Sequence, residues 1–358
     1  MLVRSFIIIV SLTSPIWARA TLISVVQVFR HGERAPINHY PNDPYKDVAY
    51  WPVGPGQLTN VGKTQHFHLG EYTRQRYINN LPAAYSNNFF YAQTTDVDRT
   101  HMSAQCNLLG LFPPTETERW NPDIDWSPIP VHPSDPNVIN SYPNCPAYDA
   151  EQQRVTVEEP YFQKIDEQYR DTYEYISNYS GSNITTLQGI GTVFDSLFIE
   201  NELGYTLPSW TQAIFPEPLA TLEGLRFQSY VYNRKLMRLS AGPFLNEVIG
   251  HFEKMRKNSS TAEFYRMYSA HDFNIAQVLS SLGRFNPPRA PYFASTIYFE
   301  LWEFLGRYHV NIYYKDKDTI EKITPEGCWQ FDCSLSKLKN TLSDILIDTD
   351  TLKNECVG

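Results

Sequence analysis

Residues 25–36 read VVQVFRHGERAP, and they complete an apolar segment that begins at Thr21. Residues 21–29 are β-branched and apolar with little alternation, which is typical of a strand buried on both faces of a parallel sheet. Arg30, His31 and Arg34 follow directly. Because ligands of open α/β sheets bind at the carboxyl ends of the strands, this cationic turn is predicted to form a binding site. A solvated charged turn is the simpler alternative, since a short motif has limited specificity.

The first twenty residues have the features of a secretory signal peptide. Arg4 precedes the apolar run Phe6–Val10, and Ala18-Arg19-Ala20 matches an A-x-A cleavage site. We therefore expect cleavage after Ala20. A transmembrane anchor would need about 20 apolar residues, and this run is much shorter.

The charge of the chain argues against two classes of partner. The formal net charge is −9, and removing Arg4 and Arg19 with the signal peptide makes it −11. An acidic protein is a poor partner for nucleic acid or for an anionic membrane. The C-terminal residues LKNECVG contain no apolar tail for a membrane anchor. The expected product is a secreted, soluble protein, with delivery to the lysosomal lumen as the second possibility.

Five cysteines in a secreted chain predict disulfides. Cys328 and Cys333 are close enough in sequence to form a local bridge. Cys106 lies in an apolar helical pattern and is expected to be a free buried thiol. Cys145 and Cys356 then remain to pair with each other.

No metal or cofactor is expected from the sequence. Paired CxxC motifs are absent, and the histidines lack ligand spacing; His66 and His68, two residues apart on an expected helix, face different ways. Three glycosylation sequons, at Asn178, Asn183 and Asn258, support passage through the secretory route.

Two further strands are predicted to end in polar residues. Residues 89–94 form one strand, followed by Asp98-Arg99, and residues 264–270 form another, followed by His271-Asp272. Residues 297–303 and 308–314 alternate as in a hairpin. Helices are expected over residues 59–76, 102–111, 161–176, 191–202, 219–239, 243–255, 274–282 and 335–346.

This order of elements predicts an α/β fold with a mainly parallel central sheet flanked by helices. Residues 135–255 are mostly helical and lack strand–helix alternation, so we interpret them as a cap inserted into the α/β domain. The predicted organisation is a signal peptide at 1–20, an α/β domain at 21–134 and 256–358, and a helical cap domain at 135–255.

The three strand ends would meet if the strands are neighbours. The shared edge would then hold three arginines, two histidines and a carboxylate. Guanidinium groups this close repel one another unless an anion lies between them, and a tetrahedral dianion satisfies them with bidentate hydrogen bonds. We therefore expect a phosphate site. A nucleoside triphosphatase or a two-metal phosphatase is disfavoured, because there is no glycine-rich phosphate loop and no acidic metal cage.

The same residues resemble a known family. RHGxRxP at residues 30–36, Asp98-Arg99 and the late segment YSAHD resemble the histidine acid phosphatases, in particular their prostatic and lysosomal branch. GQLTNVGKTQHFHLGEYTRQRY, TTDVDRTHMSA, LFPPTE, NPDIDWSPIPVH and TLPSW follow in family order, so the resemblance covers nearly the whole mature chain.

The resemblance implies a mechanism and a set of roles. His31 would be the nucleophile that forms a phosphohistidine, and Asp272 would protonate the leaving alcohol. The phosphoryl oxygens would be bound by Arg30, Arg34, Arg99 and His271. Neighbouring arginines keep a nucleophilic histidine neutral, and a protonated Asp272 favours acidic conditions, so we expect an acid pH optimum.

Two positions depart from the family pattern. Glu33 stands where many relatives have Asp, which should be harmless. Phe273 stands where relatives often have Thr, and it could change how the leaving group is seated.

The leading hypothesis is a secreted, metal-independent acid phosphatase that acts on small phosphate monoesters or phosphoproteins. The alternative is a catalytically silent, secreted protein that binds small ligands on the same scaffold. A specialised phytase or phosphomutase is a third hypothesis, although this acidic chain lacks an evident positive lining for phytate. Members of the family often form dimers, for which residues 120–132 could serve, and the sequence leaves the oligomeric state open.

Overall fold

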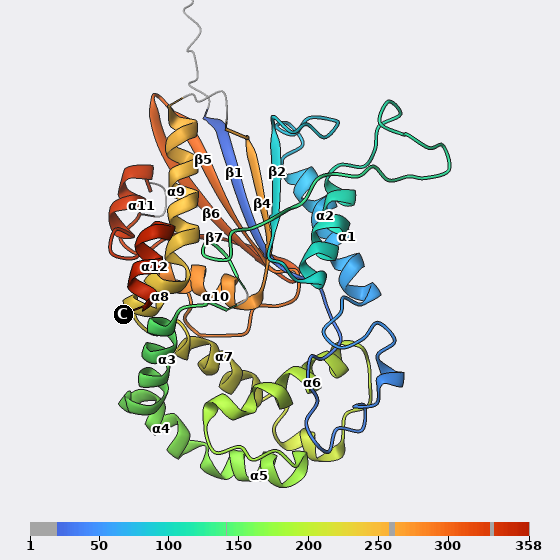
Figure 1. Ribbon diagram of the computed structural model, residues 1–358, viewed down its shortest axis with the longest axis vertical. Coiled ribbons are helices and arrows are strands. Elements are labelled where there is room, and N and C mark those ends of the chain that lie inside the picture. Colours follow the sequence, from blue (N-terminus) through green and yellow to red (C-terminus); the bar gives the residue numbers. More distant parts are fainter. Residues whose placement is uncertain (1–19, 141, 258–261, 330–332, 358) are drawn as a thin grey trace, which may run out of the picture.

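A computed structural model describes residues 20–140, 142–257, 262–329 and 333–357. Residues 1–19 of the expected signal peptide and the sequon residue Asn258 lie outside the described residues. Within the described part of the chain, the fold is a seven-stranded sheet flanked by helices, with further helices extending beyond one end of the sheet (Figure 1).

The sheet has the strand order β3-β2-β4-β1-β5-β6-β7. Its strands are β1 Thr21–Arg30, β2 Phe90–Thr94, β3 His132–Pro133, β4 Tyr265–Ala270, β5 Thr296–Phe304, β6 Arg307–Asp316 and β7 Thr319–Ile323.

The predicted α/β class is confirmed, but the sheet is mixed rather than mainly parallel. Strands β3, β2, β4 and β1 pair in parallel, whereas β1 with β5, β5 with β6 and β6 with β7 pair antiparallel. Strands β5 and β6 form the expected hairpin, and β7, which the sequence analysis did not predict, extends it. An antiparallel pair needs only a tight turn, so β5, β6 and β7 follow one another through the short connections 305–306 and 317–318.

Strand β1 lies at the centre of the sheet because both of its faces are apolar. Val26 and Val28 face one layer of helices, and Val25 and Phe29 face the other. Each of these side chains is at most 1% exposed. This two-sided burial accounts for the lack of alternation in the sequence.

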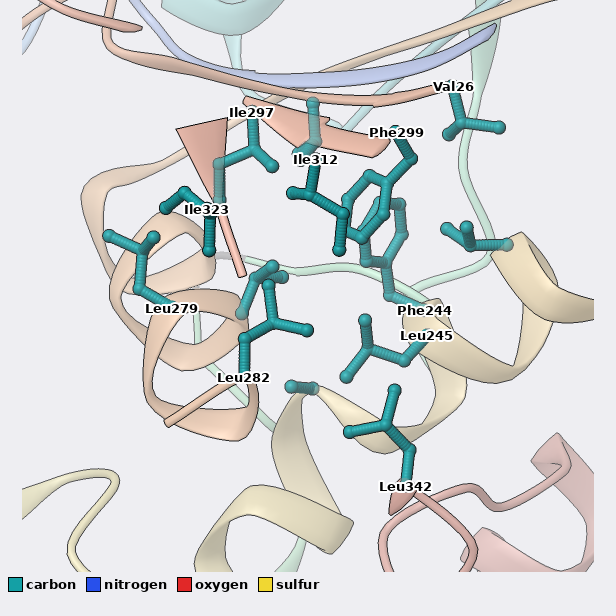
Figure 2. Packing of buried hydrophobic residues seen from close by; sticks show 14 of the residues in the cluster. Val26, Phe244, Leu245, Leu279, Leu282, Ile297, Phe299, Ile312, Ile323 and Leu342 are labelled. Carbon is teal, nitrogen blue, oxygen red and sulfur yellow. The ribbon is translucent and has the colours of Figure 1, made fainter. Parts of the chain in front are cut away.

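Helices cover both faces of the sheet (Figure 1). Helices α1 and α2 pack on the face that carries Val25 and Phe29. Helices α9 and α10 pack on the opposite face, where Phe244 and Leu245 of α9 contact the side chains of the strands (Figure 2). The bounds of the covering helices are α1 Asn60–Arg76, α2 Asp98–Leu111, α9 Gly242–Arg256, α10 Asp272–Ser281 and α11 Leu335–Thr341.

A second hydrophobic core lies among the helices of the middle of the chain. In Figure 1 α4, α5 and α6 lie away from the sheet. The proposed division into an α/β domain and a helical cap stays a prediction. The elements of this part are α3 Pro146–Glu158, α4 Pro160–Gln168, α5 Arg170–Ser180, α6 Gly191–Glu202, α7 Leu219–Ser229, α8 Arg234–Ser240 and α12 Thr349–Val357, with short 3-10 turns at Val48–Tyr50, Leu187–Ile190 and Ser209–Ala213.

Three helices expected from the sequence are shorter or divided. The segment 161–176 is split between α4 and α5, and the segment 219–239 is split between α7 and α8. Asn233 causes the second break, because its side chain caps α8 by accepting from the backbone N–H of Leu236. The last expected helix ends at Thr341, and α12 starts anew after Asp348, whose carboxylate accepts from the N–H groups of Asp350 and Thr351.

The described residues include the disulfides Cys145–Cys356 and Cys328–Cys333, as predicted. Cys106 is a free thiol, as expected, but it is partly exposed rather than buried. It sits on α2, and the core face of that helix is taken by Ala104 and Leu108 instead.

The surface carries two of the expected sequons. Asn178 lies in α5 and Asn183 just after it, and both side chains are exposed. Among the described residues, no helix combines the length and the apolar character needed to cross a membrane.

Candidate active site

The carboxyl ends of β1, β2 and β4 bring the site residues together. Strand β4 lies between the other two, with Ala270 opposite Arg30 and Ser269 opposite Thr94. His31 follows β1, His271 and Asp272 follow β4, and Arg99 lies in the first turn of α2 after β2. All six site residues predicted from the sequence line one cavity of about 1160 Å³: Arg30, His31, Arg34, Arg99, His271 and Asp272.

His31 is held with one ring nitrogen available for chemistry. The side chain is 2% exposed, and its Nδ1 lies 2.7 Å from the carbonyl oxygen of Gly32. A carbonyl can only accept, so Nδ1 carries the proton and Nε2 keeps its lone pair. Burial, followed by the charges of Arg30 and Arg99, lowers the pKa of His31 well below its usual range. The imidazole is therefore neutral and nucleophilic even in acid.

Arg30 is fixed on three sides. Its Nη1 donates to the carbonyl oxygen of Pro291 at 2.6 Å, and its Nη2 pairs with Oδ2 of Asp272 at 2.8 Å. The guanidinium also lies 4.0 Å from the ring centroid of Phe293. These contacts orient a fully buried cation, which has little freedom left to lose when an anion binds.

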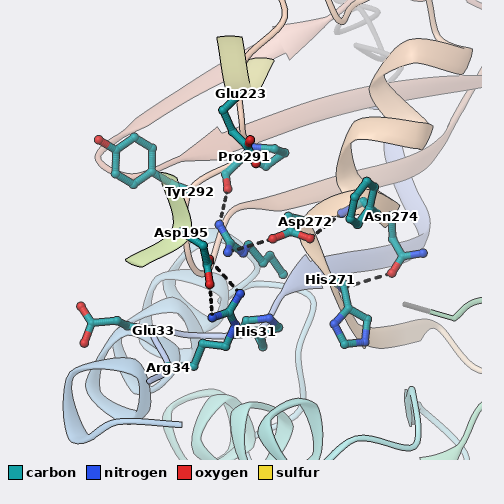
Figure 3. Close-up of polar contacts among 12 residues, drawn as sticks. His31, Glu33, Arg34, Asp195, Glu223, His271, Asp272, Asn274, Pro291 and Tyr292 are labelled. Carbon is teal, nitrogen blue, oxygen red and sulfur yellow. Dashed lines mark hydrogen bonds and ion pairs between the residues drawn. The ribbon is translucent and has the colours of Figure 1, made fainter. Parts of the chain in front are cut away.

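Arg34 has a partner that the sequence analysis did not identify. Both of its terminal nitrogens donate to Asp195 of α6, each at 2.9 Å (Figure 3). Asp195 lines the same cavity. Nothing in the local sequence marks this aspartate, because it lies 161 residues after its partner in an ordinary helical segment.

Arg99 differs from the other two arginines. Among the described residues, no hydrogen-bond or ion-pair partner of its guanidinium is found, and its Nε is buried without an acceptor. Burial, with the charges of Arg34 and Arg30, lowers the pKa of Arg99 to about 10, although Asp272 opposes this. Arg99 therefore stays charged and is the cation most available to an incoming anion.

His271 faces His31 across the site, with ring centroids 5.5 Å apart and an edge-on geometry. Its Nε2 lies 2.8 Å from the hydroxyl of Thr95, and its backbone N–H donates to the side chain of Asn274. Burial and the charge of Arg99 lower the pKa of His271 to about 3. It is therefore a neutral hydrogen-bonding group rather than a fourth cation.

Asp272 is the first residue of α10. Its Oδ1 accepts from the N–H of Phe273 at 2.9 Å, while Oδ2 pairs with Arg30. Burial would raise the pKa of this carboxyl, but Arg30, Arg34 and His271 outweigh it and the net pKa is lowered. The free protein thus holds Asp272 as a carboxylate, whereas the predicted role requires it to be protonated.

The two departures from the family pattern have different settings. Glu33 is 1% exposed and points away from the other labelled site residues (Figure 3). Its carboxylate accepts from the hydroxyl of Thr59 at 2.8 Å. It helps to seat the start of α1. Phe273 lines the cavity and packs against Phe227 and Tyr230, with ring centroids 4.7 and 4.8 Å away.

The outer cavity combines aromatic side chains with polar ones such as Gln188, Gln212 and Glu223, and the sequence did not reveal this lining. Side chains from α6, α7 and the loops around them form its walls. The aromatic members are Tyr142, Phe194, Phe198, Tyr205, Phe215, Phe227, Phe273 and Tyr292.

Comparison with known proteins identifies the family of the chain. Residues 21–318 match the model of the histidine phosphatase superfamily, branch 2. The chain belongs to this family. It is 36% identical to prostatic acid phosphatase from Bos taurus over 332 residues, covering 90% of this chain and 84% of the relative. It is also 36% identical to lysosomal acid phosphatase from Rattus norvegicus over 329 residues, covering 88% and 75%. This histidine phosphatase is therefore one of the histidine acid phosphatases.

Solved structures support the fold of this histidine phosphatase. A phytase from Citrobacter braakii superposes with a TM-score of 0.69 at 17% identity, covering 94% of this chain and 99% of the phytase. A Hafnia alvei phytase in complex with myo-inositol hexakis sulphate gives a TM-score of 0.70 at 16% identity, covering 92% and 98%. At these identities the likeness concerns the fold alone.

Proposed function

We propose that this histidine acid phosphatase hydrolyses phosphate monoesters through a covalent phosphohistidine at His31, without a metal ion. One observation carries the proposal. A neutral, buried imidazole with a free Nε2 lies in one cavity with Arg30, Arg34 and Arg99, next to the carboxyl group of Asp272. The three guanidiniums supply the positive charge that a transferring phosphoryl group requires.

In the first step, the Nε2 lone pair of His31 attacks phosphorus and the bond from phosphorus to the ester oxygen breaks. Asp272 gives its proton to the departing alcohol. In the second step, water attacks phosphorus and gives a proton to Asp272, the bond between phosphorus and Nε2 breaks, and phosphate leaves. The negative charge on the phosphoryl oxygens rests against the arginines throughout.

Substrate binding is expected to raise the pKa of Asp272, so that this group can hold the proton that the mechanism requires. In the free protein Arg30 keeps this group ionised. A bound phosphate dianion takes over part of that contact and adds negative charge beside the carboxyl group, and both changes raise its pKa. The acid form is then most populated at low pH, so activity is expected to peak below neutrality.

The cavity favours leaving groups with an aromatic ring. Phe198, Phe273 and Tyr292 line the same cavity as Arg30 and His31, and rings stack well on such walls. Small aryl phosphates, or phosphotyrosine in a phosphoprotein, match this lining.

The enzyme is proposed to act outside the cell. The signal-like residues 1–20, the exposed sequon residues Asn178 and Asn183, and the disulfides are consistent with secretion, and a lysosomal site is the alternative. A homodimer through residues 120–132 would cover Trp120, which is 59% exposed.

The test compares turnover of two substrates, p-nitrophenyl phosphate and an alkyl phosphate, at pH 5 by the wild type, His31→Ala and Asp272→Asn. We expect His31→Ala to lose at least ~1000-fold in kcat/KM. Asp272→Asn should lose roughly 100-fold or more on an alkyl phosphate, and less on p-nitrophenyl phosphate, whose leaving group needs no proton. His68→Ala, an exposed histidine on α1, is the matched control and should be unchanged.

A second measurement tests the covalent step. The wild type is mixed with radioactive phosphate ester and quenched in alkaline detergent, since phosphohistidine is acid-labile, and the label on His31 is located by peptide mapping. A folded wild type that binds phosphate but turns over no ester would instead support the silent binding protein. Turnover without label on His31 would reject the proposed route while leaving the phosphatase activity standing.

A further inference from the structure

A second polar cluster lies behind the wall of the active-site cavity. It consists of His39 and Asp43, from the segment between β1 and α1, and Glu200 of α6. One nitrogen of His39 and one oxygen of each carboxyl group lie within 4.8 Å of one another. None of the three lines the active-site cavity, although Asn38 and Asn201 beside them do.

Glu200 is the unusual member of this cluster. Its side chain is fully buried, and neither carboxyl oxygen has a hydrogen-bond donor among the described residues. Asp43 is satisfied, because Oδ1 accepts from the N–H of Tyr45 at 2.7 Å and Oδ2 lies 2.6 Å from Nδ1 of His39. The hydroxyl of Tyr40, also buried, has no partner among the described residues either.

A bare carboxylate in this position is costly. Burying a carboxyl group without a donor carries a desolvation penalty, and the neighbouring Asp43 adds repulsion. Something positive must therefore occupy the space between the two carboxyl groups. A proton on Glu200 would serve, and so would a metal cation.

We propose that His39, Asp43 and Glu200 bind a divalent transition metal of the zinc type. One imidazole nitrogen and two carboxylate oxygens match the three protein ligands of a four-coordinate zinc site, whereas magnesium and calcium prefer oxygen ligands only. Ligands about 2 Å from a tetrahedral ion lie about 3.3 Å apart. The ligand atoms here lie within 4.8 Å of one another, so binding requires the most widely separated pair to move closer by up to about 1.5 Å. Two carboxylates and one dication sum to zero charge, which suits a buried site.

The cluster can be reached from solvent on one side. The side chain of His39 is 18% exposed, so water can reach the cluster from that side. The metal would fix the segment around His39 to α6, the helix that also carries Asp195, the partner of Arg34. Its expected effect is on the stability of this part of the molecule rather than on phosphoryl transfer.

The spacing explains why no sequence motif indicates this site. His39 and Asp43 are four residues apart in a proline-rich loop, and Glu200 follows more than 150 residues later. Such a site is found only when the fold brings the loop and α6 together.

The experiment is calorimetric titration of the full-length protein with Zn²⁺ at pH 7.5, after chelator treatment, together with thermal unfolding. We expect one Zn²⁺ per chain with Kd of about 1 µM or below. Zn²⁺ should raise Tm, and Mg²⁺ should not. Glu200→Gln and His39→Ala should each weaken Zn²⁺ binding by at least about tenfold and leave turnover of p-nitrophenyl phosphate within about twofold of wild type.

His68→Ala is the control, because His68 and Glu71 form an exposed pair with a 2.9 Å contact, and this variant should bind Zn²⁺ like the wild type. The proposal is overturned if the wild type binds no Zn²⁺ below about 100 µM, or if both Glu200→Gln and His39→Ala bind it as tightly as the wild type. Should Glu200→Gln fail to fold, the partly exposed His39 still decides the question through His39→Ala. Absence of Zn²⁺ binding with a Glu200→Gln protein more stable than wild type would identify a shared proton as the occupant.

Discussion

At the scale of single residues, the free site is a set of cations already held by carboxylates. Asp272 neutralises Arg30, Asp195 neutralises Arg34, and Arg99 stays without an ion-pair partner among the described residues. A substrate phosphate must therefore compete with two protein carboxylates. The cost of this competition is offset by arginines that need no reorientation when the phosphate arrives.

Replacing Asp195 with Asn tests both roles of this carboxylate, which stabilises Arg34 in the free protein and competes with phosphate for it. The amide cannot balance the charge of Arg34, so we expect Asp195→Asn to lower the free energy of unfolding by roughly 1–3 kcal/mol in phosphate-free buffer, less than for a fully buried pair because the Asp195 side chain is 27% exposed. Phosphate no longer competes with a carboxylate and should bind more tightly. Thermal unfolding titrated with phosphate measures both changes.

The control for this experiment is Glu202→Gln, which removes another carboxylate of α6 from the cavity lining without touching Arg34; its own partner is Lys317 at 3.7 Å. Phosphate should raise Tm more in Asp195→Asn than in wild type or in Glu202→Gln. An equal rise in all three proteins would mean that Asp195 does not compete with the anion.

The site residues predicted from the sequence lie at or shortly after the ends of strands that the sequence pattern identifies. Arg30, His31 and Arg34 lie in one motif at the end of a recognisable strand, so their position follows from local pattern. Asp195 has no such mark. Its role depends on the path of the chain between β2 and α6, which no local periodicity encodes. The aromatic cavity wall was missed for the same reason.

At the scale of elements, a buried histidine on α9 links the sheet packing to pH. His251 is 3% exposed, and its Nε2 lies 2.9 Å from the hydroxyl of Ser24 on β1. That hydroxyl donates to the carbonyl oxygen of Phe264, so it accepts from His251. Burial, with the charges of Arg266 and Lys254, lowers the pKa of His251 to about 3.

The direction of the pH effect follows from this shift. Below pH 6.5 His251 binds a proton in the unfolded chain but stays unprotonated in the folded protein. The free energy of unfolding therefore falls as the pH drops toward about 3. His251→Gln can still donate to Ser24 but cannot be protonated. Between pH 7 and pH 4.5 the stability of this variant relative to wild type should therefore improve by about 2–3 kcal/mol.

Urea unfolding at the two pH values measures that difference. His68→Gln, on the exposed face of α1, should show no comparable change. If His251→Gln and wild type lose stability in parallel on acidification, the buried histidine is not a source of acid sensitivity.

The packing of α1 on α2 depends on two glycines. A Cβ on Gly70 would lie 2.0 Å from the carbonyl oxygen of Asn107, and one on Gly110 would lie 2.1 Å from that of Phe67. Gly70→Ala must separate the helices, so we expect a loss of about 1–3 kcal/mol and a raised KM, because α2 carries Arg99. Gly250→Ala on α9, where a Cβ meets nothing within 4 Å, should be neutral or stabilising.

Thermal unfolding and steady-state kinetics with p-nitrophenyl phosphate test this pair of variants. A Gly70→Ala protein with unchanged KM and stability would show that α1 and α2 can move apart at little cost.

Element boundaries were the part of the fold that the sequence predicted least well. Apolar periodicity identified the helical segments 161–176 and 219–239, but it runs through the breaks inside them. The second break is made by Asn233, which offers the backbone a cap in place of another helical turn. The first break falls at Tyr169, which makes no side-chain cap. Asp348 acts in the same way before α12. Both signals were present in the sequence and were outweighed by the hydrophobic pattern.

At the scale of the whole molecule, the end of the chain is tied back to its middle. Cys145, at the start of α3, and Cys356 of α12 join within the second hydrophobic core, across a sequence separation of 211 residues. Cys328 and Cys333 are only five residues apart. The two disulfides thus restrict the unfolded chain to very different extents.

Removing each disulfide in turn tests how much of the stability comes from this long closure. In the chain-entropy description, a closed loop of this length stabilises by about 5 kcal/mol and the short loop by about 2 kcal/mol. Urea unfolding should therefore show Cys145→Ala/Cys356→Ala to be about 3 kcal/mol less stable than Cys328→Ala/Cys333→Ala. Neither pair lines the active-site cavity, so KM should stay unchanged in both. Equal losses would mean that native packing around the cysteines, rather than the length of the closed loop, sets their contribution.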